Sequence, residues 1–90
     1  MERTDDQILA LGEGCRRVLE DETFNQLFKE YSDASLATIV ASQPHEVKAR
    51  EHEYAKIQAL IGFSNFLAGF VEAAQNIINR SNPNIQSDED

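Results

Sequence analysis

Two histidines and three glutamates in the middle of the chain are the residues whose types could bind a metal ion. His45 and His52 lie among Glu46, Glu51 and Glu53. In a helix, residues seven apart share a face, but the rise of about 1.5 Å per residue separates them by roughly 10 Å. That is too far to share one ion, and paired histidines at i, i+4 are absent. The sequence therefore predicts no metal site within one chain and no cofactor, and a site shared between chains has no specific signal.

A second candidate for chemistry is Cys15, the one cysteine of the sequence. Arg16 and Arg17 follow it, and neighbouring guanidinium groups can lower the pKa of a thiol. A nucleophile also needs a base and an oxyanion site, and no motif marks either one. Gly12 and Gly14 have no strand before them, so they do not form a phosphate-binding loop. We therefore expect Cys15 to be a small core residue, with no catalytic residue in the chain and no enzymatic activity.

The charge of the chain argues against nucleic acid as a partner. Its 90 residues include 16 acidic and 8 basic side chains, which leave a formal net charge of −8. Affinity for nucleic acid depends on clustered lysine and arginine, and here the basic residues are dispersed. A single cysteine also excludes an intrachain disulfide and fits the reducing interior of a cell.

The location that we expect is the cytoplasm. The first residues, MERTDDQ, are acidic, and the apolar run ILALG after them is too short for the core of a signal peptide. The stretch 57–78 has the length to span a membrane. Six polar side chains interrupt it, namely Gln58, Ser64, Asn65, Glu72, Gln75 and Asn76. Because such side chains are costly inside a bilayer, we expect a buried helix of a soluble assembly instead.

Spacing and capping signals predict a short helix at the N-terminus. Thr4 or Asp5 is suited to cap it. Gly12 and Gly14 each cost about 1 kcal/mol relative to alanine in a helix interior, so we expect this segment to be helical only when it is docked. The apolar face of the helix comprises Ile8, Leu11, Cys15 and Val18.

Two longer helices follow. Asp21 is the preferred cap of a second helix that ends near Ala41, and Ser42-Gln43-Pro44 separates it from a third helix, from Pro44 to about Arg80. The short connection predicts an antiparallel pair. At about 1.5 Å per residue the third helix is roughly 55 Å long and the second roughly 30 Å, so part of the third is left uncovered.

These elements predict an all-α fold: a helical hairpin of a medium and a long helix, preceded by a short N-terminal helix. We expect a single domain over residues 1–80 and a flexible acidic tail over residues 81–90. A single core is marginal at this length, and no disulfide supports it. The expected completion is therefore an oligomeric helical bundle.

The stretch 54–78 carries the strongest signal for a partner, because it is apolar around most of its circumference. Counting in steps of four and three gives a line that we call the small-residue seam: Ala55, Ala59, Gly62, Phe66, Gly69 and Ala73. Alternatively, Gly62 and Gly69 accept bulky side chains of the second helix, such as Phe24 or Phe28. The residues expected at an interface with a second copy are Ala59, Gly62, Phe63, Phe66, Gly69, Phe70 and Ala73.

Short motifs give the chain a resemblance to a known class of proteins. They are D-x-x-F at 21–24, S-x-P-x-E at 42–46, R-E at 50–51 and the run 54–60. In style and spacing, from Leu19 to Ala74, the chain resembles small acidic helical proteins encoded beside the structural genes of tailed bacteriophages. The resemblance implies a part in the virion or its assembly, in the host cytoplasm or the particle. It assigns no functional residue.

Two hypotheses of function follow. The first is a structural or assembly protein that self-associates through its long C-terminal helix as a homo-oligomer. The second is an acidic regulatory or inhibitory protein that binds a basic host or defence protein. The second hypothesis depends on the acidic side chains Glu20, Asp21, Glu22, Glu30 and Asp33.

Overall fold

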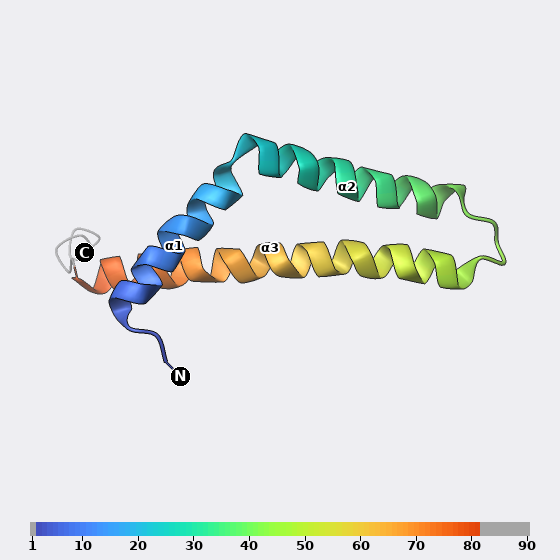
Figure 1. Cartoon of the computed structure of the whole chain (residues 1–90). Helices are drawn as coiled ribbons and strands as arrows, with labels where there is room; N and C mark the ends of the chain where they lie inside the picture. Colours follow the sequence, from blue (N-terminus) through green and yellow to red (C-terminus); the bar gives the residue numbers. More distant parts are fainter. Residues whose placement is uncertain (1, 82–90) are drawn as a thin grey trace, which may run out of the picture. The chain divides into compact units, whose positions relative to one another are not determined.

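Three helices make up the described part of the chain, residues 2–81 of a computed structural model. They are α1 (Asp5–Glu20), α2 (Glu22–Ala41) and α3 (Val47–Ser81), shown in order in Figure 1. No strand occurs over this range, so the all-α fold of a short, a medium and a long helix is confirmed. The acidic tail expected from residue 81 lies outside the described residues, apart from Ser81 at the end of α3.

Side-chain caps fix the starts of the first two helices. Thr4 Oγ1 accepts from the backbone N–H of Gln7 at 3.2 Å, while Gln7 Oε1 accepts from the N–H of Thr4 at 2.8 Å. This reciprocal pair is a capping box. Asp21 accepts from the N–H of Phe24 at 2.8 Å. Asp21 was the predicted cap of α2, Thr4 was one of the two residues predicted to cap α1, and α2 ends at Ala41 as predicted.

The third helix begins at Val47, three residues later than predicted. Pro44 lies instead in a turn that is closed by the N–H of Glu46 donating to the carbonyl of Gln43 at 2.9 Å. The guanidinium of Arg50 donates to the carbonyls of Gln43 at 2.6 Å and Pro44 at 3.2 Å. Because one side chain satisfies these carbonyls, the turn is stable without becoming the first turn of the helix.

The chain forms two compact units, and the long helix contributes to both. Among the described residues, the first unit comprises residues 2–19 and 66–81. The second comprises Glu20–Asn65. Helix α3 itself is continuous from Val47 to Ser81.

In the second unit, α2 and the first half of α3 form the expected antiparallel hairpin (Figure 1). Tyr31 meets Lys56, whose ammonium lies 5.6 Å from the centre of the ring. Nearer the connection, Ser42 accepts from Arg50 at 3.0 Å. From Tyr31 to Ser42 the chain runs forward along α2, while the partners Lys56 and Arg50 run backward along α3. The two helices are therefore antiparallel, and these contacts fix which residues of α2 lie opposite which residues of α3.

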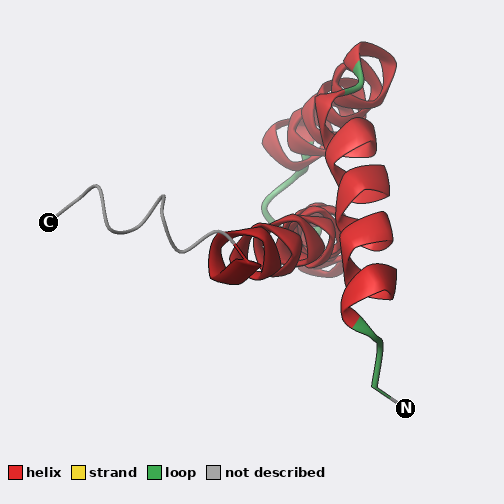
Figure 2. Cartoon of the chain, turned by 90° about the vertical axis from the view of Figure 1, so that its left-hand side faces the viewer, coloured by secondary structure: helices red, strands yellow, loops and turns green. Residues whose placement is uncertain are grey.

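In the first unit, α1 packs across the C-terminal part of α3 (Figure 2). The contact is centred on Gly12, which is buried. A Cβ built on Gly12 would lie 2.9 Å from the carbonyl oxygen of Phe70 and would collide with the Cβ of Ala74. Only a residue without a side chain allows the two backbones to approach this closely. Cys15 and Ile77 are buried in the same unit, so the expectation of Cys15 as a small core residue is met.

Candidate interaction surface

The residues that could bind a metal ion are not brought together by the fold. His45 lies in the turn before α3 and His52 lies on α3, and both are exposed. Across residues 2–81, no group of three or more His, Cys, Asp or Glu side chains is arranged to hold an ion.

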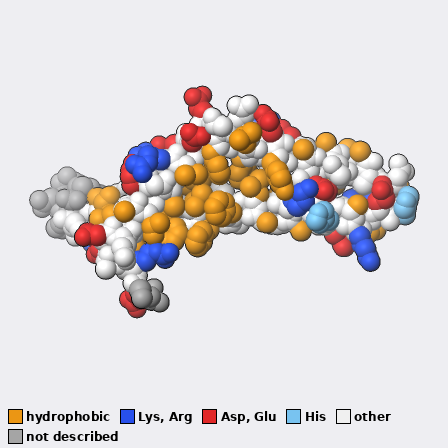
Figure 3. Space-filling model, in the orientation of Figure 1, with side chains coloured by type: hydrophobic (Ala, Val, Ile, Leu, Met, Phe, Trp, Pro, Cys, Tyr) orange, Lys and Arg blue, Asp and Glu red, His pale blue; other side chains and the backbone are white. Residues whose placement is uncertain are grey.

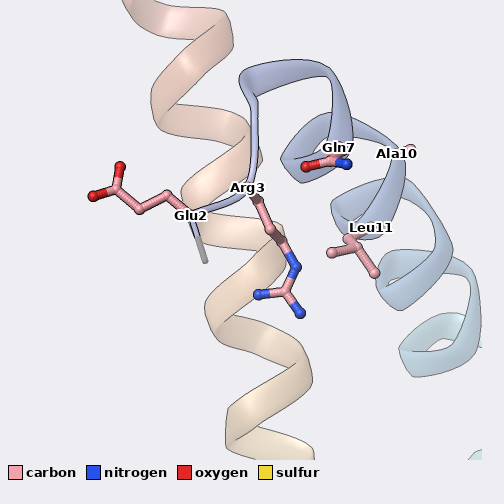
Figure 4. Close-up of a pocket in the computed structure, with 5 residues that line it drawn as sticks. All are labelled: Glu2, Arg3, Gln7, Ala10 and Leu11. Carbon is pink, nitrogen blue, oxygen red and sulfur yellow. The ribbon is translucent and has the colours of Figure 1, made fainter.

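A shallow hollow lies at the start of α1 in the first unit. Glu2, Arg3, Gln7, Ala10 and Leu11 line it (Figure 4). The guanidinium of Arg3 lies 5.0 Å from the centre of the Phe70 ring on α3, whereas the side chain of Glu2 points away from the hollow. A guanidinium over an aromatic face is a cation–π contact. The described residues that line the recess do not include a nucleophile paired with a base.

A polar cluster joins the two helices of the second unit. Ser35 is 3% exposed, and its hydroxyl donates to the carboxylate of Glu53. Lys56 also donates to Glu53, at 3.2 Å. The hydrogen bond from Lys56 is the main cause that lowers the pKa of Glu53, assisted by Ser35 and opposed by partial burial. The hydrogen bond from Glu53 in turn raises the pKa of Lys56. This cluster holds α2 and α3 in register.

Replacing Ser35 with alanine is expected to raise the pKa of Glu53 toward its ordinary value, because one donor to the carboxylate is lost. The folded pKa of Glu53 lies below the unfolded value of about 4.3, so its contribution to stability is present at neutral pH and fades as pH falls below about 4.3. Carboxyl chemical shifts followed through an acid titration by NMR measure this directly. Ser32→Ala, one turn earlier on α2, is the control that should leave the midpoint unchanged; equal midpoints in all three proteins would contradict the assignment.

Large apolar side chains remain exposed over both units. Among the described residues, no large side chain is fully buried. Figure 3 shows apolar atoms open on the surface in view, with the histidine side chains toward the end where α2 connects to α3. The exposed residues include Leu27, Leu36, Val40, Tyr54, Ile61, Phe63 and Phe66. Because exposed apolar side chains often mark contact surfaces, these residues are candidates for one in each unit.

In the second unit, the small-residue seam faces away from α2. The side of α3 that is half-buried carries Glu53, Ile57, Leu60 and Ser64. Ala55, Ala59 and Gly62 on the seam are exposed, and Phe63 beside them is 52% exposed. A Cβ built on Gly62 would have no described atom within 4 Å outside its immediate helix surroundings. Neither Phe24 nor Phe28 therefore fills the space over Gly62.

In the first unit, α1 covers a different side of α3 from the seam. Ala74 and Ile77 are buried, and Phe70 is half-buried. On the seam, Phe66 is 60% exposed and Gly69 is exposed, while Ala73 is half-buried. A Cβ on Gly69 also meets open space within the part of the chain that the structure describes. Of the seven residues expected at an interface, five are therefore exposed and two are half-buried.

Two exposed apolar residues flank the seam and were not among those expected at the interface. Ile61 is 42% exposed, and Ala68 is exposed one heptad further along α3. The sequence could have predicted them as interface residues, because each precedes a seam glycine by one residue. Each adds to the exposed apolar surface beside the seam within its own unit.

The acidic side chains of the second hypothesis are exposed, but several have partners within the chain. Asp21 caps α2. Asp33 accepts from Lys29 at 2.7 Å, which raises the pKa of that lysine, and Glu30 accepts from Gln26 at 2.9 Å. These carboxylates therefore have structural roles on α2 itself.

Helix α3 is also long and apolar enough to cross a membrane, judged by length and composition. A core helix of a soluble protein, which is mostly buried, passes the same test, whereas only 6% of the apolar window of α3 is buried within the described chain; one such helix is weak evidence either way. Comparison with models of protein families, with curated proteins and with solved structures finds no match to this chain. The case for a contact surface therefore rests on the exposure and spacing of the residues described above.

Proposed function

We propose that this chain is a non-enzymatic α-helical structural or assembly protein that self-associates through α3. The observation that carries the proposal is the open space over Gly62 and Gly69, with Phe66 between them 60% exposed. Small residues at this spacing allow a second helix to approach closely, and the exposed ring supplies apolar area to bury.

The energetics favour a partner over an isolated chain. Each glycine in a helix interior costs about 1 kcal/mol relative to alanine, and packing usually offsets this cost. Gly12 meets that expectation against Ala74, whereas Gly62 and Gly69 have no comparable neighbour among the described residues. Burying one phenylalanine side chain contributes roughly 1.5–3 kcal/mol. A second helix packed on the seam would offset the cost of Gly62 and Gly69 and would bury the ring of Phe66.

The resemblance to small acidic helical proteins of tailed bacteriophages supports a more specific role. We assign the chain to the virion or to its morphogenesis, acting in the host cytoplasm or in the particle. A protein of this kind needs surfaces for its neighbours and no catalytic site. The negative charge of −8 keeps such a small apolar assembly soluble.

Native mass spectrometry at micromolar concentration tests the proposal. We expect masses at multiples of 10.1 kDa and a melting temperature that rises with protein concentration. The measurement is made without detergent, because a helix that crosses a membrane would need detergent to remain in solution. A stable monomer with a cooperative, concentration-independent melt would overturn the proposal.

The second candidate is an acidic regulatory or inhibitory protein, and the exposure of Glu20, Asp21, Glu22, Glu30 and Asp33 is the observation that favours it. Reversing these charges should then abolish the capture of a basic partner from host lysate. Capture that is insensitive to the reversal would exclude this alternative.

A further inference from the structure

The two helices of the second unit meet through an interface that is mostly polar. Within Glu20–Asn65 one residue alone is buried, and it is a serine, Ser35. Leu27, Leu36 and Val40 of α2 are instead more than half exposed. Eleven residues of the unit are half-buried, and six of these are polar or charged: Ser32, Ser42, Arg50, Glu53, Lys56 and Ser64. The unit therefore encloses polar groups and leaves much of its apolar surface open.

The first unit is held together differently. Its buried residues in the described ranges are Gly12, Cys15, Ala74 and Ile77, which carry no polar side chain apart from the weakly polar thiol. Burial of apolar surface is the main favourable term in folding, and most of the stability of a helix comes from packing against a neighbour. The second unit has no buried apolar residue. The stability of α2 therefore depends more on polar contacts across its interface with α3.

We propose that the second unit opens separately: α2 parts from the first half of α3 when Glu53 loses its charge, while α1 stays docked on the C-terminal half of α3. The stability of a protein is not uniform, and cooperative parts of one fold open at different free energies. The boundary between the two units falls at Glu20, next to Asp21, which is the one residue between α1 and α2 outside a helix. This inference goes beyond the proposed function, because it concerns the single chain and needs no second copy.

Glu53 is the group on whose charge the polar cluster depends. Its partners are Lys56 and His52 from α3 and the hydroxyl of Ser35 from α2, and each of them favours the charged carboxylate. The ammonium of Lys56 lies 3.0 Å from a Glu53 oxygen and also meets the ring of Tyr31 on α2. Only 15% of the Glu53 side chain is exposed, so water screens these contacts less than on an open surface.

Protonation of Glu53 therefore weakens the contact between α2 and α3. The hydrogen bond from Lys56 holds the pKa of Glu53 below its ordinary value, and the hydrogen bond from Glu53 holds the pKa of Lys56 above its own. At neutral pH both groups are charged and the cluster is intact. As pH falls below about 4.3, the unfolded value for glutamate, the contribution of Glu53 fades while Lys56 stays charged. Acid then opens the second unit.

Hydrogen exchange followed by mass spectrometry tests the inference in the full-length chain at neutral pH. Glu53→Gln keeps the shape of the side chain and an oxygen that accepts from Ser35, but removes the charge. We expect the protection of the α2 amides to fall roughly tenfold, with the α1 amides unchanged. Glu51→Gln, at an exposed position two residues earlier on α3, makes the same change in net charge and should alter neither helix. All three proteins are compared at one concentration.

The parent chain supplies a second measurement that needs no substitution at Glu53. As pH is lowered from neutrality to about 3, the protection of α2, corrected for the slower chemical exchange in acid, should fall before that of α1. Loss of protection in both helices together, in acid or in a Glu53→Gln chain that fails to fold, would show one cooperative unit and overturn the inference. Unchanged α2 in Glu53→Gln, or an equal loss in Glu51→Gln, would refute the role of this carboxylate.

Discussion

Replacing Gly12 with alanine is expected to lower the free energy of unfolding, because overpacking a filled site costs about 1–3 kcal/mol. The new Cβ would meet the Phe70 carbonyl oxygen at 2.9 Å and the Cβ of Ala74. A backbone carbonyl on a long helix cannot move aside as a flexible side chain can. The higher helix propensity of alanine recovers up to about 1 kcal/mol, so the net change in the free energy of unfolding is the overpacking cost minus this gain. Denaturant unfolding followed by circular dichroism measures it.

Gly14→Ala is the matched control, because it makes the same change two residues later on the same helix. A Cβ on Gly14 would meet no described atom within 4 Å beyond its immediate helix surroundings. Only the helix propensity then changes, and stability should rise by up to about 1 kcal/mol. Both variants are compared at one protein concentration, since association shifts apparent stability. Changes of the same sign at Gly12 and Gly14 would contradict the docking of α1 through Gly12.

The helix boundaries could be predicted because local signals determine them. Thr4 and Asp21 are short polar residues directly before helical patterns, and a side-chain oxygen there reaches an N–H three residues on. The start of α3 is less local. It depends on Arg50 reaching back to the carbonyls of Gln43 and Pro44, a contact across six to seven residues that a capping rule does not include.

The contacts between helices were harder to predict than the helices themselves. Gly12 and Gly14 look alike in sequence, and both simply weaken a helix. Only the packing of α1 on α3 shows that Gly12 is required at a close approach while Gly14 is not. Ser35 is similar, because a serine in an amphipathic stripe gives no sign that Glu53 will need its hydroxyl. The interface on α3 stays a prediction, since it concerns a second chain.

Gly69→Leu is expected to dissociate the assembly while leaving the single chain folded. Open space surrounds a Cβ at this position, so within one chain leucine should pack without conflict and should favour the helix by roughly 0.8 kcal/mol. Across a close helix contact, the same side chain would force the two backbones apart at a cost of about 1–3 kcal/mol per site. That cost corresponds to association weakened roughly 5- to 150-fold, or more because a symmetric pair contains the site twice.

The measurement pairs native mass with helix content, because each tests a different part of the expectation. Ala37→Leu, at an exposed position of α2, is the control that adds apolar surface away from the seam. In the control, mass and helix content should both match the parent chain. In Gly69→Leu the oligomer should disappear at concentrations where the parent chain is assembled, while the ellipticity at 222 nm typical of α-helix stays. An unchanged oligomer would mean that no helix passes closely over Gly69, and the contact would then have to be sought on another face of α3.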